Sequence, residues 1–259
     1  MFAELEGCSL WYETRGSGKP LILIHGFGSD HFSWDGIFEA LSASRLVVRY
    51  DLRGFGASLD RATESFSHTE DLEALLDALK IERCDVLGVS MGGAIAANFA
   101  LRVPARVNRL VLESPALVGW EWSESWRNLW RTIVKAARAG DLDEARRLWW
   151  MHPVFETTRA IPMAATKLHA TIDSYSCVHW AQGDRQEHVM VPDVERLQQL
   201  AAPTLLLTGD KDFADFRLIA EIIEAAAPNA TRIDYAGAGH LLHLEQPERF
   251  LSDVQSFLA

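Results

Sequence analysis

The stretch Gly88-Val89-Ser90-Met91-Gly92-Gly93 decides the fold of this chain. It follows Cys84-Asp85-Val86-Leu87, a short apolar run that is typical of a strand, and it precedes a run of helix formers at 94–101. A turn from strand to helix with glycine on both sides of a serine can adopt strained dihedrals without clashes. Ser90 is therefore expected to project from the end of a strand.

This short motif has two interpretations. The first is a Gly-rich turn with a capping serine, which would show the same sequence pattern, because G-x-S-x-G arises by chance in many proteins. The alternative is a nucleophile elbow, in which the serine is the attacking group. The backbone N–H of Met91 would then lie at a helix N-terminus, where unpaired donors and the helix dipole favour negative charge.

Strand and helix patterns alternate on both sides of the motif. Such alternation predicts a mostly parallel sheet with helices on both faces, and ligands of such sheets bind at the carboxyl ends of the strands. Strands are expected at residues 2–6, 9–14, 21–24, 46–50, 84–89, 109–113, 203–208 and 231–235, and helices at 33–43, 68–79, 94–101, 215–227 and 247–258.

The alternation breaks at Pro115, and residues 116–199 show helical segments without a convincing strand. We interpret them as a helical cap inserted into a core of residues 1–115 and 200–259, with helices near 123–139, 141–150 and 160–172. The tryptophans of this segment form its own core, line a pocket beneath it, or do both. The segment holds seven of the nine tryptophans of the chain, namely Trp120, Trp122, Trp126, Trp130, Trp149, Trp150 and Trp180.

Composition excludes several classes of protein. The net charge is −11 and no Lys/Arg-rich run occurs, so neither a nucleic acid nor an anionic membrane is an expected partner. We find no signal-peptide pattern and no apolar stretch as long as a membrane span. The three cysteines, Cys8, Cys84 and Cys177, are odd in number and far apart, which favours free buried thiols in a reduced compartment and a cytoplasmic location.

The chain shows no metal-binding pattern. No pair of cysteines has the spacing of a zinc site. His240 and His243 are three residues apart, but the stretch lacks the glutamate of a zincin motif. We therefore expect no metal site.

A serine hydroxyl is a poor nucleophile, so it needs a base within hydrogen-bond reach and an orienting partner for that base. Ser90, Asp212 and His240 each follow a predicted strand, in the chain order Ser-Asp-His. Phe27, in the loop His25-Gly26-Phe27-Gly28, is expected to supply an oxyanion-hole N–H together with Met91; a plain strand-to-helix loop is the alternative. The set is far more specific than any one of its motifs.

Other polar residues near the strand ends are interpreted as structural. Asp51 and Arg53 are expected to tie their loop together by an ion pair and by hydrogen bonds to backbone, and His25 to structure the oxyanion loop. For the acid that orients His240, Asp210 is expected to serve its turn instead, and Glu113 is the outside candidate.

Taken together, these motifs resemble the α/β-hydrolase superfamily over nearly the full chain, in its cap-bearing form, and within it the small carboxylesterases and enol-lactonases. The resemblance implies hydrolysis of carboxylic esters or lactones through an acyl-enzyme, with no cofactor. Serine at position 90 argues against epoxide hydrolases and haloalkane dehalogenases of this fold, which use an aspartate. The residues that carry the resemblance are His25-Gly26-Phe27-Gly28, Asp51 to Ser58, Gly88 to Gly93, Gly209-Asp210-Lys211-Asp212 and Gly239-His240.

The expected substrate is a small-molecule ester or lactone with a small to medium, mainly apolar acyl group, and charged acyl groups are expected to react less well. Arg127, Arg131 and Arg159 could each hold a single carboxylate, but no cluster is recognisable as a clamp for a dianion.

Two alternatives stay open: the same triad could serve C–C bond hydrolysis, perhydrolysis or elimination, or the chain could be a ligand-binding sensor. Monomer and homodimer are both compatible with the sequence. The tryptophans expected to line the pocket are Trp120, Trp126, Trp149 and Trp180.

Overall fold

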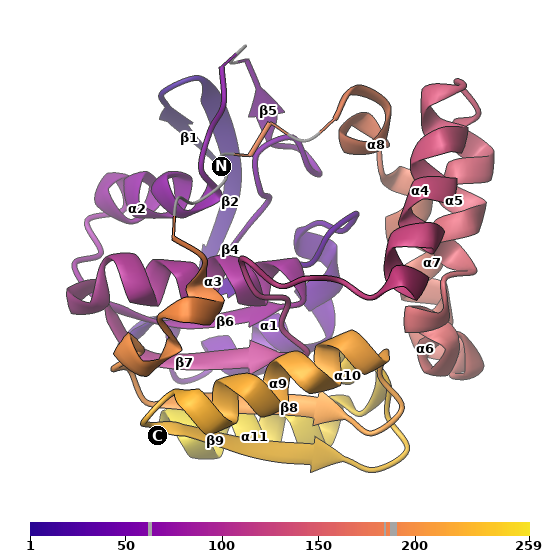
Figure 1. Cartoon of the computed structure of the whole chain (residues 1–259). Coiled ribbons are helices and arrows are strands. Elements are labelled where there is room, and N and C mark those ends of the chain that lie inside the picture. Colours follow the sequence, from indigo (N-terminus) through magenta and orange to yellow (C-terminus); the bar gives the residue numbers. More distant parts are fainter. Residues whose placement is uncertain (62–63, 184, 187–190) are drawn as a thin grey trace.

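The computed structural model describes residues 1–61, 64–183, 185–186 and 191–259. Within these residues nine strands form one sheet in the order β1-β2-β4-β3-β6-β7-β8-β9, and β5 pairs with β2 (Figure 1). The first strands pair antiparallel as a hairpin, β2 pairs antiparallel with β4, and the sheet is parallel from β4 onward. The strands are β1 Phe2–Leu5, β2 Cys8–Arg15, β3 Pro20–Ile24, β4 Leu46–Tyr50, β5 Leu59–Asp60, β6 Cys84–Val89, β7 Val107–Glu113, β8 Thr204–Gly209 and β9 Ala230–Tyr235.

Each central strand is buried on both of its faces. In β3, Leu21 and Leu23 belong to one apolar cluster, whereas Ile22 and Ile24 belong to the other, because successive side chains of a strand point to opposite sides. All four side chains are fully buried. A continuous apolar run is therefore what a central strand under two helical layers requires.

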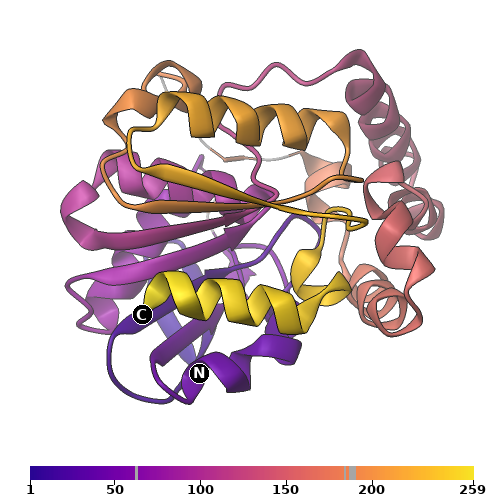
Figure 2. The ribbon, with the colours of Figure 1, turned by 90° about the horizontal axis from the view of Figure 1, so that it is seen from below.

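Helices cover both faces of this sheet. The first cluster contains residues of α2 (His68–Ala78), α3 (Met91–Arg102) and α9 (Ala214–Ala226), and the second contains residues of α1 (Asp35–Ser42) and α11 (Pro247–Leu258). Figure 2 shows α9 and α11 on opposite sides of the strands. The α/β-hydrolase architecture predicted from the sequence is confirmed.

Five further helices lie together beside the carboxyl ends of the strands (Figure 1), and we call α4 to α8 the helical layer. Their starts follow from local capping, since the Ser123 hydroxyl accepts the N–H of Trp126 and the Asp141 carboxylate accepts the N–H of Glu144. The helices predicted near 123–139, 141–150 and 160–172 all form, to within two residues. The helical layer consists of α4 Glu124–Arg138, α5 Leu142–Trp150, α6 Glu156–Ala160, α7 Pro162–Ser174 and α8 Val178–Gln182.

Short elements complete the structure. The helix predicted over residues 33–43 begins as a 3₁₀ turn, because the Asp30 side chain accepts the N–H of Phe32, and only then continues as α1. Strand β5 was not predicted from the sequence. The remaining short helices are η1 His31–Trp34, η2 Pro104–Arg106, η3 Pro153–Phe155, η4 Asp193–Glu195, η5 Leu197–Gln199 and α10 Leu242–Glu245.

The three cysteines are free and buried, as predicted. Across the described ranges, the helices are all too short or too polar to cross a bilayer. Because β3, β4 and β6 to β9 are parallel, the loops after them converge on one edge of the sheet, next to the helical layer.

Candidate active site

Ser90 lies between β6 and α3 with a left-handed backbone, φ 54° and ψ −116°. Non-glycine residues adopt such angles rarely, and they concentrate at functional sites. The Ser90 N–H donates to the Glu113 carbonyl at 2.9 Å, and the Ser90 carbonyl accepts the N–H of Ala94 at 3.1 Å. The turn is therefore held by β7 on one side and by α3 on the other.

The glycines around Ser90 leave no room for side chains. A Cβ at Gly88 would overlap the backbone of Gly92, and a Cβ at Gly92 would overlap the carbonyl groups of Ile24 and His25. Since these obstacles are backbone atoms, no rotamer change could relieve them. The motif is thus required by the packing of β3 against the elbow.

The loop His25–Gly28 passes directly beside Ser90, since a Cβ on Gly26 would lie 3.4 Å from the Ser90 Cβ. Within the described residues, neither the Phe27 N–H nor the Met91 N–H donates to a backbone or side-chain acceptor. Two free donors beside a serine at a helix N-terminus are a suitable site for an oxyanion. The Phe27 ring packs among the aromatic rings of the helical layer, 4.9 Å from Trp130 between centroids.

His25 holds this loop in place. Its Nδ1 donates to the Gly26 carbonyl at 2.8 Å, and its Nε2 accepts the N–H of Leu52 at 3.0 Å. Complete burial lowers the pKa of His25, so the ring is neutral and can donate at one nitrogen and accept at the other. This is the structural role expected from the sequence.

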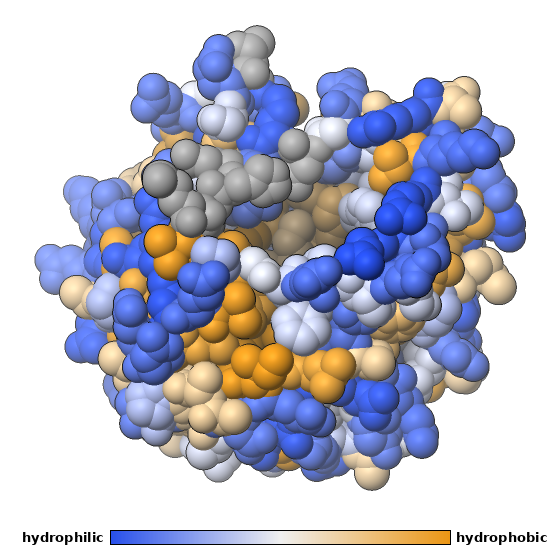
Figure 3. Space-filling view, in the orientation of Figure 1, coloured by the Kyte–Doolittle hydropathy of each residue, from blue (hydrophilic) through white to orange (hydrophobic). Residues whose placement is uncertain are grey.

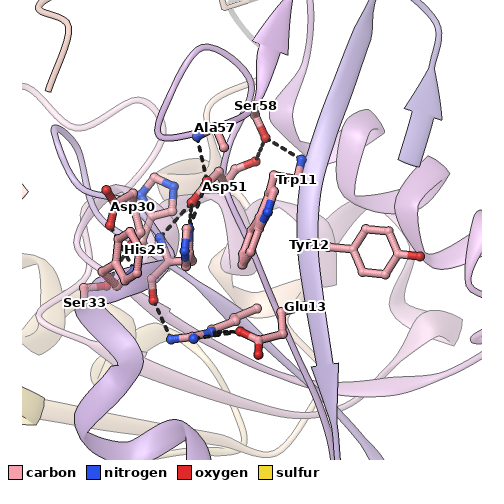
Figure 4. Close-up of polar contacts among 12 residues, drawn as sticks. Trp11, Tyr12, Glu13, His25, Asp30, Ser33, Asp51, Ala57 and Ser58 are labelled. Atoms are coloured by element: carbon pink, nitrogen blue, oxygen red, sulfur yellow. Dashed lines mark hydrogen bonds and ion pairs between the residues drawn. The ribbon is translucent and has the colours of Figure 1, made fainter. Parts of the chain in front are cut away.

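Asp51 is the centre of a second supporting network (Figure 4). Its carboxylate accepts the backbone N–H of His31 at 2.7 Å, the His31 Nδ1 proton at 2.8 Å and the N–H of Ala57 at 2.8 Å. Burial opposes the charged form, but the hydrogen bond from His31 and its charge neighbours hold the pKa of Asp51 below its usual range. Arg53 pairs with Asp71 of α2 at 2.9 Å. Both residues thus tie loops to the core, and the ion pair joins Arg53 to α2.

His240 and Asp212 meet at the carboxyl edge of the sheet. The His240 Nδ1 lies 3.0 Å and 3.1 Å from the two carboxylate oxygens of Asp212. Asp212 follows β8 and also accepts the N–H of Phe213 at 2.7 Å, whereas His240 follows β9. Both side chains are buried, and the Phe216 ring lies 4.2 Å from the His240 ring. The Nδ1 bond leaves Nε2 as the nitrogen available to Ser90, which lines the same cavity.

The other two candidate acids have different partners. The Asp210 carboxylate accepts the N–H of Gly237 at 2.8 Å and so links the turns after β8 and β9. Glu113 accepts both the backbone N–H of His243, at 3.0 Å, and its Nδ1 proton, at 2.8 Å. Glu113 therefore connects the Ser90 elbow, through its carbonyl, to the helix that follows His240.

Glu245 binds the backbone on both sides of His240. Its carboxylate accepts the N–H of Gly239 at 2.5 Å and that of Leu241 at 3.4 Å. The same carboxylate accepts the hydroxyl proton of Thr158, from α6 of the helical layer, at 2.5 Å. One buried carboxylate thus links the helical layer to the loop that carries His240.

A cavity of about 420 Å³ lies between the strand ends and the helical layer. Ser90, Met91, Phe27 and His240 all line it. Its wall on the side of the helical layer is mostly aromatic and aliphatic, as is usual for small-molecule sites. The apolar wall includes Trp122, Trp126, Trp130, Trp149, Phe155, Leu168 and Ile172.

The tryptophan assignment needs correction at two positions. Trp126 and Trp149 line the cavity as expected, but Trp120 and Trp180 do not. The Trp120 Nε1 donates to Asp215 of α9 at 3.1 Å, which turns the ring toward the core. Trp180 is fully buried behind Trp149, at 5.9 Å between ring centroids.

Trp122 and Trp130 take those places in the cavity wall. Trp122, Trp126 and Trp130 are spaced by four residues, and their rings stack in sequence at 4.6 Å and 6.4 Å. Trp126 and Trp130 share one face of α4, because residues four apart in a helix are neighbours, and Trp122 precedes the helix and stacks on Trp126. That spacing was the signal in the sequence that would have separated these three tryptophans from Trp120.

In the part of the chain that the structure describes, no group of three His, Cys, Asp or Glu side chains is arranged to hold a metal ion. The reactive groups at the cavity include the Ser90 hydroxyl and the His240 imidazole, whose Nδ1 contacts the Asp212 carboxylate.

Residues 21–253 match the model of the alpha/beta hydrolase family, and the chain belongs to this family. It is 29% identical to a pimeloyl-[acyl-carrier protein] methyl ester esterase of Nitrosomonas europaea, over 94% of this chain and 97% of the relative. It is also 29% identical to a 2-hydroxymuconate semialdehyde hydrolase of a Pseudomonas species, over 94% and 88%. A crystal structure of a hydrolase from Pseudomonas aeruginosa superposes with a TM-score of 0.83 at 27% identity, over 100% and 98%. The chain is thus a hydrolase of this family, with esterases and an enol-lactonase among its relatives.

Proposed function

We propose that this protein hydrolyses carboxylic esters or lactones through an acyl-enzyme, with Ser90 as nucleophile, His240 as general base and Asp212 as its orienting acid. The observation that carries the proposal is the Asp212–His240 pair, 3.0 Å apart, at the cavity that Ser90 also lines. A carboxylate on Nδ1 fixes the imidazole tautomer whose Nε2 accepts a proton. The similarity to an ester-cleaving relative supports the same reaction class.

In the proposed mechanism, His240 removes the Ser90 proton as the hydroxyl oxygen attacks the ester carbonyl. The N–H groups of Phe27 and Met91 then stabilise the tetrahedral oxyanion, each by about 3 kcal/mol in the transition state. The protonated His240 gives its proton to the leaving alcohol. Water, activated in turn by His240, cleaves the acyl-enzyme and regenerates Ser90.

The helical layer would act as a cap that selects the acyl group. Its contribution to the cavity wall is mostly aromatic, so we propose small to medium, mainly apolar acyl chains. Lactones fit the same chemistry as cyclic esters, in which the leaving alcohol stays attached to the acyl group.

The test is hydrolysis of p-nitrophenyl esters by the wild-type protein and by Ser90→Ala. Removal of a triad nucleophile lowers kcat by about 10⁶-fold, and circular dichroism should show that the variant is folded. Mass spectrometry after a rapid quench should find the acyl group on Ser90. A variant that keeps a tenth of the activity would show that Ser90 is not the nucleophile, and a folded wild type without turnover would favour a sensor.

The second candidate is C–C bond hydrolysis of a vinylogous diketone by the same residues. The similarity to the 2-hydroxymuconate semialdehyde hydrolase favours it. Comparing kcat/KM for such diketones and for esters of equal size separates the two reactions. We expect esters to react faster.

A further inference from the structure

The wall of the cavity beside Ser90 contains two arginines and no acidic residue among the described lining. Arg127 and Arg131 are the only residues with a formal charge among those described as lining it, and no aspartate, glutamate or lysine joins them. Both belong to α4, where they follow Trp126 and Trp130 of the aromatic wall. Two exposed arginines therefore stand in the wall of a cavity that is otherwise lined mostly by apolar side chains and by Ser90 and His240.

No carboxylate of the described cavity lining pairs with either guanidinium. Arg127 lies 3.5 Å from Glu121, whose side chain is 92% exposed, so this pair is screened by water and weak. Arg131 donates to the uncharged amide oxygen of Asn128 at 2.7 Å. Both groups can therefore exchange or share these partners when an anion arrives.

Helix α4 concentrates positive charge in a protein with a net charge of −11. It carries four basic residues and a single acidic one, Glu124. Arg127, Arg131 and Lys135 are four residues apart and share one face. Figure 3 shows strongly hydrophilic side chains along the edge of α4 that faces the hollow in this side of the molecule.

Arg159, the third arginine considered from the sequence, is committed elsewhere. Its guanidinium donates to the backbone carbonyls of Trp150 and His152 at 2.6 Å and 2.9 Å. It stabilises the turn between α5 and α6. Arg127 and Arg131 are thus the pair that can meet a substrate.

We infer that the preferred esters carry a carboxylate at the end remote from the ester bond, with Arg127 and Arg131 binding that carboxylate while the ester lies at Ser90. This inference rests on the proposed function and names its substrate class. A guanidinium matches a carboxylate with two parallel hydrogen bonds, and the aromatic wall fits a hydrocarbon spacer between the two ends. The sequence-based expectation that charged acyl groups react poorly is thereby reversed for a single terminal carboxylate.

The experiment compares monomethyl esters of straight-chain dicarboxylic acids with methyl esters of monocarboxylic acids of equal length. We expect the half-esters to have the higher kcat/KM at one or two chain lengths. Arg127→Gln and Arg131→Gln should each lower this preference by roughly threefold to tenfold, a range set by partly exposed charged hydrogen bonds. The preference is a ratio of two kcat/KM values, so a change that affects half-esters and neutral esters equally cancels. Loss of the preference while neutral esters are still hydrolysed separates this inference from the proposed function.

The matched controls are Lys135→Gln and Arg138→Gln, which remove the same charge from the same helix away from the cavity wall. They should leave the preference intact. Arg131→Lys should restore it only in part, because lysine lacks the bidentate geometry. Esters that end in a phosphonate distinguish a general anion site from a carboxylate site, and a preference for them would overturn the carboxylate assignment.

A binding measurement tests the inference without turnover. Adipate should quench the tryptophan fluorescence of Ser90→Ala protein, because Trp126 and Trp130 adjoin the two arginines. The apparent Kd should rise in Arg127→Gln and Arg131→Gln protein. An unchanged Kd, or an unchanged half-ester preference in both variants, would overturn the inference.

Discussion

At the scale of single residues, the Ser90 elbow requires glycines, which have no Cβ atom. Gly92 lies against the carbonyl groups of Ile24 and His25, where a Cβ would overlap backbone. We therefore predict that Gly92→Ala lowers the free energy of unfolding by at least about 2 kcal/mol, because β3 and the elbow must separate. Urea unfolding followed by circular dichroism measures this loss.

Gly36→Ala is the control for this prediction. Gly36 lies within α1, and a Cβ there would meet only the mobile end of Lys167, at 3.1 Å. Alanine in a helix is favoured over glycine by about 1 kcal/mol, so this variant should be neutral or more stable. Equal stability of Gly92→Ala and wild type would contradict the overlap.

The assignment of the acid leads to a second prediction at this scale. Asp212→Asn should keep the fold and lower kcat by about 10⁴-fold, because asparagine favours the wrong tautomer of His240. Asp210→Asn and Glu113→Gln are the matched variants, since their carboxylates bind Gly237 and His243 instead. The assignment fails if either of these variants loses more activity than Asp212→Asn under ester saturation.

At the scale of elements, α6 meets the loop of His240 through one side chain. The Thr158 hydroxyl donates to Glu245, which also accepts the N–H of Gly239 and so positions His240 from outside the reaction. Thr158→Val should lower kcat about tenfold with little change in KM, since it removes a hydrogen bond to a buried carboxylate. Thr158→Ser should restore kcat because it keeps the hydroxyl.

A purely structural role for Thr158 predicts a different result. The folded fraction of Thr158→Val would then keep normal kcat and a normal rate of Ser90 phosphonylation by an organophosphorus ester, and only its stability would fall. Thr166→Val serves as control, because the Thr166 hydroxyl bonds within α7 to the Pro162 carbonyl.

The stacked face of α4 belongs to the same scale. Trp126→Ala and Trp130→Ala should shift the chain-length profile of kcat/KM across C2 to C12 p-nitrophenyl esters toward longer chains, because one methylene is worth roughly 1–3 kcal/mol in an apolar pocket. Trp120→Ala should leave the profile unchanged, since its ring is bonded to Asp215. If all three substitutions change the profile equally, they act by destabilising the fold and not by enlarging the cavity.

At the scale of the whole molecule, the sequence predicts topology better than it predicts the cavity wall. Ser90, Asp212 and His240 lie at strand ends that a parallel sheet brings to one edge. The alternation of strand and helix patterns in the sequence is therefore enough to predict that they lie close together. The direction of Trp120 depends instead on its hydrogen bond to Asp215, 95 residues away in sequence, and that of Trp180 on how α8 packs against the core, which short-range patterns do not encode. Glu245 was not predicted, because Thr158 is 87 residues away in sequence and the contact with the Gly239 N–H depends on the conformation of the loop after β9.

Two buried histidines couple the stability of the whole molecule to pH. Within the described residues, His68 Nδ1 and His152 Nε2 have no hydrogen-bond partner. Burial lowers the pKa of His68 to about 3, and burial together with the electrostatic interaction with His240 lowers the pKa of His152 to about 4. Both rings are therefore neutral in the folded protein at pH 5, whereas in the unfolded chain they are mostly protonated at that pH.

We predict that the free energy of unfolding falls as the pH falls from about 6.5 to about 4. Over this range the unfolded chain takes up protons that the folded protein excludes, and at pH 5 each histidine accounts for about 2 kcal/mol of the loss. Urea unfolding at pH 7 and pH 5 gives the difference between the two free energies of unfolding. A packing change that is the same at both pH values cancels from this difference for each variant. His68→Gln and His152→Gln should each shrink the difference by about 2 kcal/mol, whereas His169→Gln should leave it unchanged, because His169 is exposed on α7. A difference that is the same in all four proteins would mean that other groups, and not these two rings, set the acid limit of the fold.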